Sequence, residues 1–292
     1  ATTTNVGGNT LYGVSMGDAN NGVAVGSAGK IVYTSDGGDT WTVVISPVGG
    51  NHMRGVSMSD ASNGVAVATG GKIVYTTNGG VTWTAATTTN VGGTIMYAVS
   101  MIDASNGVAV GQSGQIVYTT NGGVDWTDAT TTNVGTTTMW GVSMGDASNG
   151  VAVGATGTIV YTSDGGDTWT AATTTNVGAT YMWGVSMSDA SNGVAVGQSG
   201  QIVYTTNGGV DWTDATTTNV GVTHMRGVSM SDASNGVAVG HSGQIVFAGS
   251  ASSEDSTTGE EKESSSDTCY DCEAPKLTKV EVHITSQNSE TQ

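Results

Sequence analysis

The sequence predicts an all-β fold, a six-bladed β-propeller of four-stranded antiparallel blades, on three observations. A cassette repeats almost unchanged from residue 1 to about 249, and its tryptophans at 41, 83, 126, 169 and 212 are spaced by 42 or 43 residues. The tetrapeptide GVSM or AVSM begins at residues 13, 55, 98, 141, 184 and 227, which gives six units. Each unit alternates short apolar stretches with glycine turns, a pattern typical of a propeller with one blade per repeat.

The unit from residue 182 to 217 illustrates the elements of one blade. MWGVSM alternates polar and apolar residues and predicts the first strand, and the polar SDASNG forms a turn. The second strand is expected over residues 194–196 and the third over residues 202–204, because both runs are apolar and bounded by glycine turns. Asn207-Gly208-Gly209 predicts a tight hairpin, and a fourth strand begins at Trp212 and runs through the Thr-rich ATTTN.

The sixth unit departs from this pattern after Phe247, where AGSASS stands in place of TNGGVDWT. Its fourth strand is therefore missing. Residues 1–6 match the end of that strand in the other units, so we expect them to pair with residues 244–247 and close the ring.

Beyond the propeller at residues 1–249, a Ser-rich acidic linker spans residues 250–268 and a tail spans residues 269–292. Cys269 and Cys272 favour a small disulfide loop, with pairing between chains as the alternative. Residues 277–285 alternate apolar and polar side chains and predict one strand, whose buried face is Val280, Val282 and Ile284. A lone strand must add to a sheet edge, and exchange with a neighbouring copy, which would complete blade six, is the favoured outcome.

The hairpin carries a family resemblance. Residues 34–41, Thr-Ser-Asp-Gly-Gly-Asp-Thr-Trp, fit the Ser/Thr-x-Asp-x-Gly-x-Thr-Trp pattern of the Asp-box (BNR) repeat proteins, as do residues 162–169. The longer string GVAVGxxGxIVYTTNGGxTW is most similar to the propellers related to photosystem II assembly factors. The resemblance implies that the box is a folding device whose carboxylate accepts backbone hydrogen bonds while the tryptophan packs between blades. The resemblance implies this structural role for Asp36, Trp41, Asn78, Trp83, Asn121, Trp126, Asp164, Trp169, Asn207 and Trp212.

Variation between the units is concentrated in two connections, the one from the fourth strand to the next blade and the one between the second and third strands. Both lie on the same face of an antiparallel blade. The first connection presents a ring of Tyr12, Arg54, Tyr97, Trp140, Trp183 and Arg226, with His52 and His224 beside it. Aromatic faces stack on sugars or hold cations and arginine binds carboxylates, so this face is the candidate ligand-binding surface. The alternative is that these residues only fill the mouth of the channel or drifted after duplication.

Composition excludes several functions. The net charge is −17, divided between 14 Asp against 4 Lys and Arg in residues 1–249 and ten acids against three lysines in the tail. Such a surface disfavours nucleic acid and anionic membranes, and no apolar run is long enough to span a bilayer. The histidines have no metal-ligand spacing, so we expect no metal and no cofactor. Few lysines among many Thr, Ser, Asn and Gly residues favour an extracellular or cell-surface location.

These observations predict a non-catalytic structural or adhesive subunit that associates with copies of itself through its C-terminal strand. The alternative is a monomeric ligand-binding propeller, lectin-like or assembly-factor-like, with a glycan or another surface protein as partner. The lack of an evident basic patch counts against the assembly-factor alternative. A remote alternative is a glycoside hydrolase of the sialidase type. The ring holds only two arginines, and no glutamate precedes Glu254, so neither the arginine cluster nor the Tyr/Glu pair of that chemistry is present.

Overall fold

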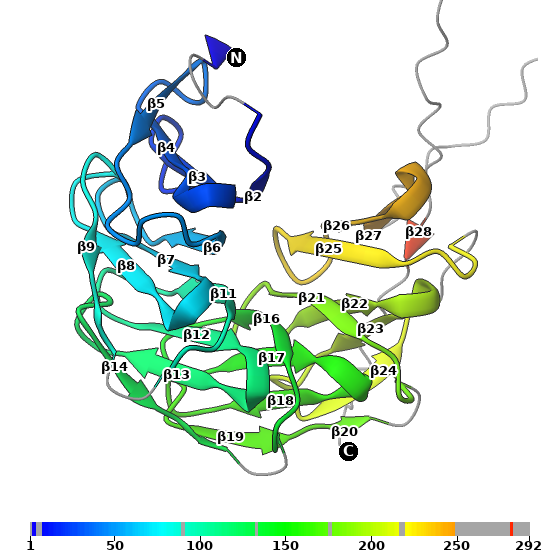
Figure 1. Cartoon of the computed structure of the whole chain (residues 1–292). Helices are drawn as coiled ribbons and strands as arrows, with labels where there is room; N and C mark the ends of the chain where they lie inside the picture. The colour runs from blue at the N-terminus through cyan, green and yellow to red at the C-terminus, as the bar shows by residue number, and fades with distance from the viewer. Residues whose placement is uncertain are drawn as a thin grey trace, which may run out of the picture.

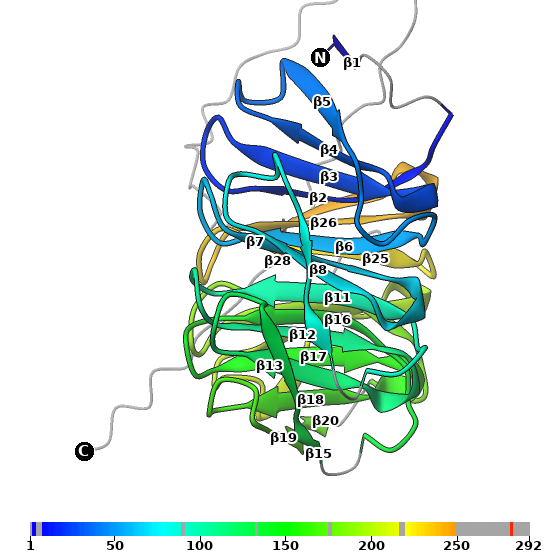
Figure 2. The same ribbon diagram turned by 60° about the vertical axis from the view of Figure 1, so that its left-hand side comes forward.

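The chain folds into six blades arranged around a central axis, as predicted (Figure 1). The structure is a computed structural model and describes residues 2–3, 8–88, 91–131, 134–174, 177–215, 220–248 and 281–282. The predicted linker at 250–268, the cysteines at 269 and 272, and Val280 and Ile284 lie outside the described residues. The blades are numbered 1 to 6 in chain order, and in Figure 2 the sheet of blade 1 lies above that of blade 2, with the sheets of blades 3 and 4 below.

The first strand of each blade lies innermost, and each inner strand contacts the next around the ring. The inner strands are β2 (Leu11–Met16), β6 (Met53–Met58), β11 (Met96–Met101), β16 (Met139–Met144), β21 (Met182–Met187) and β25 (Met225–Met230). A serine hydroxyl in the inner strand of each of the first five blades accepts a hydrogen bond from a backbone N–H of the following inner strand, as Ser100 Oγ does from Met144 at 3.1 Å. Five such bonds join the six strands in series.

The second strand of each blade pairs antiparallel with the inner strand and is followed by a short 3₁₀ turn and a third strand. The second strands are β3 (Gly22–Gly26), β7 (Gly64–Ala68), β12 (Gly107–Gly111), β17 (Gly150–Gly154), β22 (Gly193–Gly197) and β26 (Gly236–Gly240). The turns are η1 (Ser27–Gly29), η2 (Thr69–Gly71), η3 (Gln112–Gly114), η4 (Ala155–Gly157), η5 (Gln198–Gly200) and η6 (His241–Gly243). The third strands are β4 (Ile31–Thr34), β8 (Ile73–Thr76), β13 (Ile116–Thr119), β18 (Ile159–Thr162), β23 (Ile202–Thr205) and β27 (Ile245–Ala248). Among the described residues these turns are the only helical segments, and none could cross a membrane.

In three of the cassettes a Thr-rich segment follows the fourth strand and pairs with the next blade, not with the blade of that fourth strand. The sequence did not indicate this change of blade. The fourth strands are β5 (Thr40–Val44), β9 (Thr84–Ala85), β14 (Asp125–Asp128), β19 (Thr168–Ala171) and β24 (Asp211–Asp214). After β9, β14 and β19 the chain crosses over, and β10 (Thr87–Thr88), β15 (Thr130–Thr131) and β20 (Thr173–Thr174) pair in parallel with the fourth strand of the next blade. We call these crossing strands straps. The first cassette reads Ile45-Ser46-Pro47 where the others read Thr-Thr-Thr, and the sheet of blade 2 has no strap.

The expected closure of the ring is wrong. β1 (Thr2–Thr3) pairs in parallel with β5 of blade 1, with the same register that joins β10 to β14, and not with residues 244–247. The N-terminal residues match the strap portion of the repeat rather than the part that pairs with a third strand, and they occupy the strap position. Blades 1 and 6 consequently stand apart (Figure 1).

Two described residues of the tail form a strand on blade 6. β28 (Glu281–Val282) pairs in parallel with β27, with Glu281 opposite Phe247 and Val282 opposite Ala248. Exchange of the tail between chains, which the sequence favoured, stays a prediction. The described strand is also shorter than the predicted one at 277–285.

The core consists of the interfaces between successive blades. At the four interfaces from blades 1 and 2 to blades 4 and 5, two valines and an isoleucine of one blade pack against methionines, an alanine and a tryptophan of the next, as Val108, Val110 and Ile116 do against Met139 and Trp169. The interface between blades 5 and 6 has the same apolar residues without a tryptophan. The second strands of blades 1 to 5 are buried along their whole length, and in blades 2 to 5 a blade covers each face. Valine and alanine suit this position, since a doubly covered strand needs small apolar side chains on both faces.

Candidate functional site

Each predicted ring residue lies at the same place in its blade, on a β-bulge near the start of the inner strand. The pairing between the first and second strands shifts register at this residue, as between Met53 and Gly55 around Arg54. The shift recurs in all six blades. A bulge redirects a side chain out of the regular alternation of a strand. We call Tyr12, Arg54, Tyr97, Trp140, Trp183 and Arg226 the bulge ring.

The glycine after the bulge lets neighbouring inner strands approach closely. A Cβ added at Gly55 would lie 3.0 Å from the carbonyl oxygen of Tyr97 in the next blade. Blade 3 has Ala98 at this position, so the site accommodates one methyl group there. A side chain larger than that of alanine at Gly55 would push the inner strands apart.

The structure brings the bulge ring together in three clusters. In the first, the Arg54 guanidinium carbon lies 5.0 Å from the ring centroid of Tyr12, and the His52 ring lies 6.4 Å from the same tyrosine. In the second, the rings of Tyr97 and Trp140 lie 4.5 Å apart. Arg54 Nε and Trp140 Nε1 are buried and have no hydrogen-bond partner.

The third cluster is the most extensive and spans blades 5 and 6. The Arg226 guanidinium lies 3.7 Å from the centroid of the Trp183 ring, a close cation–π contact. Arg226 Nε donates a hydrogen bond to His241 Nε2 at 3.2 Å, and the His224 ring lies 5.3 Å from Trp183. His224 Nδ1 in turn accepts a hydrogen bond from the backbone of Ser199. His241, in the other variable connection, was not among the predicted site residues, although its departure from Gln and Ser at that position marks it.

The charges of the propeller are divided between its two ends. Arg54 and Arg226 are the only arginines of the sequence, and both belong to the bulge ring. The two lysines of the propeller, Lys30 and Lys72, directly follow η1 and η2, whose turns pack on the start of the inner strands. The basic residues of 1–249 therefore gather at the bulge-ring end, although the sequence shows no basic patch.

The aspartates gather at the opposite end, in the turn after the inner strand and in the Asp-box hairpin. These two turns hold twelve of the fourteen aspartates of residues 1–249, namely Asp18, Asp36, Asp39, Asp60, Asp103, Asp125, Asp146, Asp164, Asp167, Asp189, Asp211 and Asp232. The two turns contact each other, as the hydrogen bond from Gly37 N to Asn20 O shows. Hydrogen bonds from the neighbouring asparagine, chiefly Asn63 for Asp60, lower the pKa of the turn aspartates and keep them ionised.

The Asp-box residues serve the hairpin itself. Asp36 accepts hydrogen bonds from the Thr40 hydroxyl and backbone and from the Thr34 hydroxyl, which lower its pKa to about 2. Each box tryptophan donates its indole N–H to the hairpin glycine, as Trp169 does to Gly166 O at 3.0 Å.

The asparagine hairpins compensate for the missing carboxylate. Where the box residue is Asn121 or Asn207, the residue four positions later is Asp125 or Asp211, and the amide donates to that carboxylate at 2.8 Å. Asn78 donates instead to the Thr82 hydroxyl, also at 2.8 Å. The sequence shows this exchange, because the hairpins with aspartate in the box read SDGGDT and two of those with asparagine read TNGGVD. It was not predicted. Among the described residues, no group of three or more His, Cys, Asp or Glu could hold a metal ion.

Comparison with known proteins identifies the repeats. The sequence profile described as Photosynthesis system II assembly factor YCF48 matches residues 3–139, 47–182 and 130–220. Comparison with curated protein sequences gives no match.

Solved structures share the fold at low sequence identity. A structure titled YCF48 bound to D1 peptide aligns at a TM-score of 0.65 and 15% identity over 82% of this chain and 78% of that one. YCF48 from Cyanidioschyzon merolae aligns at 0.50 and 15% over 81% and 94%. A GH74 enzyme of Niastella koreensis aligns at 0.56 and 18% over 82% of this chain but 36% of its own. These likenesses are of fold.

Proposed function

Because the chain belongs to the Photosynthesis system II assembly factor YCF48 family, we propose that it is a non-catalytic propeller that binds a peptide segment of a partner protein. The binding surface is the bulge ring with His52, His224 and His241. The solved structure of YCF48 bound to D1 peptide shares this fold, which supports a peptide as the class of ligand. The structural or adhesive role favoured by the sequence has no comparable support.

The observation that carries the proposal is the gathering of the basic residues at one end of an acidic molecule. Arg54 and Arg226 lie against Tyr12 and Trp183, so each cation is held by an aromatic face. Arg226 Nε is engaged by His241 and Arg54 Nε is buried, which leaves the terminal nitrogens of each guanidinium for a carboxylate. Aspartates at the far end repel an acidic ligand there and steer it to this end. The ligand is therefore a peptide that carries a carboxylate, at a side chain or at its C-terminus.

The unpartnered donors strengthen the proposal. Arg54 Nε and Trp140 Nε1 are buried without an acceptor in the protein, and a buried donor without an acceptor costs free energy. Both atoms are shielded from solvent, so the proposal requires neighbouring side chains to move when the peptide binds and its carbonyl or carboxylate oxygen supplies the missing acceptor.

The proposal is tested by titrating a D1 peptide with a free C-terminus into the full chain by isothermal titration calorimetry. Trp140→Ala combined with Trp183→Ala, and separately Arg226→Gln, are each expected to weaken binding by about tenfold or more, since interface aromatics and arginines carry most binding energy. Arg226→Lys should recover only part of the loss, because an ammonium keeps the charge but not the planar stacking.

Asp164→Asn is the control, since Asp164 belongs to an Asp-box hairpin at the opposite end and Asn78 shows that asparagine forms the same hairpin. It should leave the affinity unchanged. Equal affinity of all variants, or no binding of the peptide to the native chain, would contradict the proposed function. Thermal melting of each variant separates loss of the site from loss of the fold.

A further inference from the structure

Two seams of the ring carry the same set of one aromatic residue, one histidine and one arginine. The aromatic residue comes from the bulge ring of the earlier blade, and the histidine and the arginine flank the first methionine in the inner strand of the later blade. We call the set between blades 1 and 2 subsite A and the set between blades 5 and 6 subsite B. Subsite A is Tyr12, His52 and Arg54, and subsite B is Trp183, His224 and Arg226.

The geometry of the two subsites matches. The histidine ring meets the aromatic ring edge-on, with the centroids 6.4 Å apart in subsite A and 5.3 Å apart in subsite B. The guanidinium carbon lies 5.0 Å and 3.7 Å, respectively, from the centroid of the same aromatic ring. At the three seams between them, the later blade has neither a histidine nor an arginine at these positions, so the set is specific to the two seams.

Each histidine is fixed by the backbone of the earlier blade. His52 Nδ1 accepts a hydrogen bond from the N–H of Ala28 in η1 at 3.3 Å, and His224 Nδ1 accepts one from the N–H of Ser199 in η5 at 3.2 Å. A neutral imidazole that accepts at Nδ1 carries its proton at Nε2. Each subsite therefore places an imidazole N–H beside a guanidinium, and together these donors suit a carboxylate.

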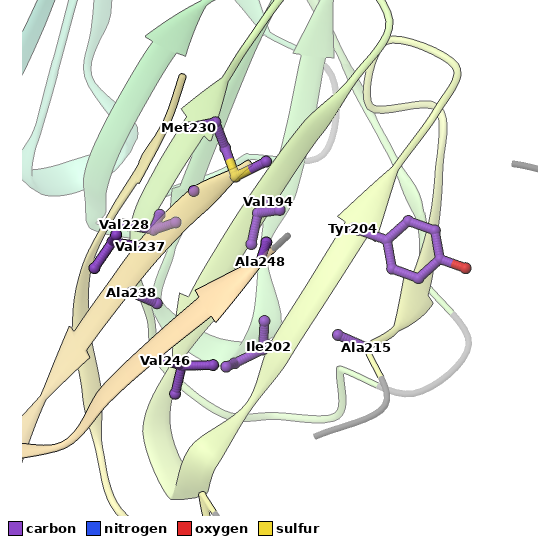
Figure 3. A pocket seen from close by; sticks show the side chains of 11 residues that line it. Val194, Ile202, Tyr204, Ala215, Val228, Met230, Val237, Ala238, Val246 and Ala248 are labelled. Carbon is purple, nitrogen blue, oxygen red and sulfur yellow. The ribbon is translucent and has the colours of Figure 1, made fainter. Parts of the chain in front are cut away.

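Apolar packing holds the two seams that carry the subsites. Val23 and Met53 belong to one buried cluster between blades 1 and 2. Figure 3 shows Val194 and Ile202 of blade 5 beside Val246 of blade 6 at the other seam. The two subsites thus stand on packed seams at one end of the ring, one on each side of the open edge between blades 6 and 1 (Figure 1).

The subsites differ in how firmly the arginine is already held. Arg226 Nε donates to His241 Nε2 at 3.2 Å, which orients the guanidinium and leaves its terminal nitrogens for a ligand. Blade 2 has Thr69 at the position of His241, and Arg54 Nε is buried without a partner. Subsite B is therefore pre-organised, whereas Arg54 has to move when a ligand engages subsite A.

We infer that one peptide segment with two carboxylates binds this end of the ring, one carboxylate in subsite B and the other in subsite A. The inference rests on the proposed function and specifies its ligand, since a peptide with one carboxylate would fill only half of the site. Because both subsites belong to one chain, engagement of the first carboxylate holds the second at a high effective concentration near its own subsite.

The test uses synthetic peptides with blocked termini and a glutamate at each end of a Gly/Ser spacer of increasing length. Their affinity for the full chain is measured by fluorescence anisotropy. At the optimal spacer length, the peptide with two glutamates is expected to bind about tenfold or more tightly than the same peptide with one Glu→Gln change. A further peptide, with one glutamate and a free C-terminus, distinguishes a terminal carboxylate from a second acidic side chain as the source of the second charge.

Arg54→Gln and Arg226→Gln should each remove the advantage of the second glutamate. Arg226→Gln should also weaken the peptide with one glutamate more than Arg54→Gln does, because subsite B is pre-organised. Lys72→Gln is the matched control, since it removes one positive charge at the same end and introduces the residue that other cassettes have, as Gln115 and Gln244. The advantage of the second glutamate should persist in this variant, and thermal melting checks that each variant is folded.

Equal affinity of the peptides with one and two glutamates at every spacer length would overturn the inference. Binding of two peptides with two glutamates to one chain would overturn it as well. If the D1 peptide binds and only Arg226→Gln weakens it, the proposed function stands with a single subsite and the inference fails. Absence of binding by every peptide, the D1 peptide included, overturns both.

Discussion

The interface between blades 3 and 4 and the open edge between blades 6 and 1 are built from nearly the same residues in different surroundings. GVAVG forms β12 in blade 3 and β26 in blade 6. Val110 of β12 is 0% exposed, while the equivalent Val239 of β26 is 45% exposed. On the facing side, Met139 is fully buried, and its counterpart in blade 1, Leu11, is 41% exposed.

This contrast shows that a cassette does not determine its own burial. Each blade has one face suited to the preceding blade and one suited to the following blade, and only a neighbour covers them. The hydrogen bonds between inner strands follow the same rule, since within the described part of the chain none joins Ser229 to Met16 across the open edge. Stability in repeat proteins is of this kind, a sum over interfaces between neighbours.

The sharpest test of the contrast is a charge placed at the same position in both strands. Val110→Asp buries a carboxylate with no partner and is expected to cost more than about 4 kcal/mol, enough to prevent folding of a marginally stable domain. Val239→Asp should change the free energy of unfolding by less than about 1 kcal/mol, because solvent reaches that side chain. Urea denaturation measures both. A similar large loss for Val239→Asp would mean that blades 1 and 6 meet in solution.

Removal of a box tryptophan extends the comparison to the opposite face. Trp169→Ala, in the interior, is expected to lower the free energy of unfolding by about 3–5 kcal/mol, the usual cost of removing a large buried aromatic side chain. Trp41→Ala should cost clearly less, because no preceding blade covers Trp41, which lines an open groove with Leu11 and Val14. Chemical denaturation of the two variants, with the native chain as reference, gives the difference directly. Equal costs would contradict the open edge.

The smallest expected effect concerns acid. The pKa of Asp36 is lowered to about 2 by Thr40 and Thr34, and hydrogen bonds also lower the pKa of Asp164. A carboxyl group with a lowered pKa in the folded state stabilises the fold above its unfolded pKa of about 4 and loses this contribution as the pH falls towards 2. Asp36→Asn with Asp164→Asn should flatten the decline of the melting temperature between about pH 4 and 2.

The same double variant should melt near the native temperature at pH 7, because Asn78 already forms an equivalent hairpin with a threonine four positions later. Scanning calorimetry across this pH range is the measurement. An unchanged acid profile would show that these two hairpins do not contribute to the pH dependence of stability.

The sequence was informative about the repeats and their family because identical segments share one structure. Six units were predicted from spacing and are confirmed by the fold, and the Asp-box resemblance, which rested on the hairpin motif, is confirmed by the family match. The resemblance implied tryptophans between the blades, and Trp83, Trp126, Trp169 and Trp212 are buried there. Closure of the ring was predicted wrongly because the Thr-rich segment was assigned to the blade before it. Parallel pairing of two residues with the next blade leaves no periodic signal, so β10, β15 and β20 could not be recognised.

The candidate site was only partly predictable. Variation between repeats placed Tyr12, Arg54, Tyr97, Trp140, Trp183 and Arg226 on one face, but the bulge that displaces them depends on pairing register and cannot be read from one strand. The gathering of basic residues was missed because two arginines 172 positions apart in the sequence form no linear patch. Extracellular location, the disulfide between Cys269 and Cys272 and association through the tail stay predictions.

The straps have a mechanical consequence. β10, β15 and β20 each pair with the blade after the one they come from, so backbone hydrogen bonds link blades 2 to 5 in series. None of these blades can separate from the others without breaking such a pairing. Within the described residues, the sheets of blades 2 and 6 hold no strap from the blade before them, so these two seams are secured by side-chain packing and inner-strand contacts instead. Under tension or heat, the row should therefore part first at these two seams and leave the linked block of blades 2 to 5 to unfold later. Amide hydrogen exchange would register that order as early loss of protection in β2 to β5 and in β25 to β27.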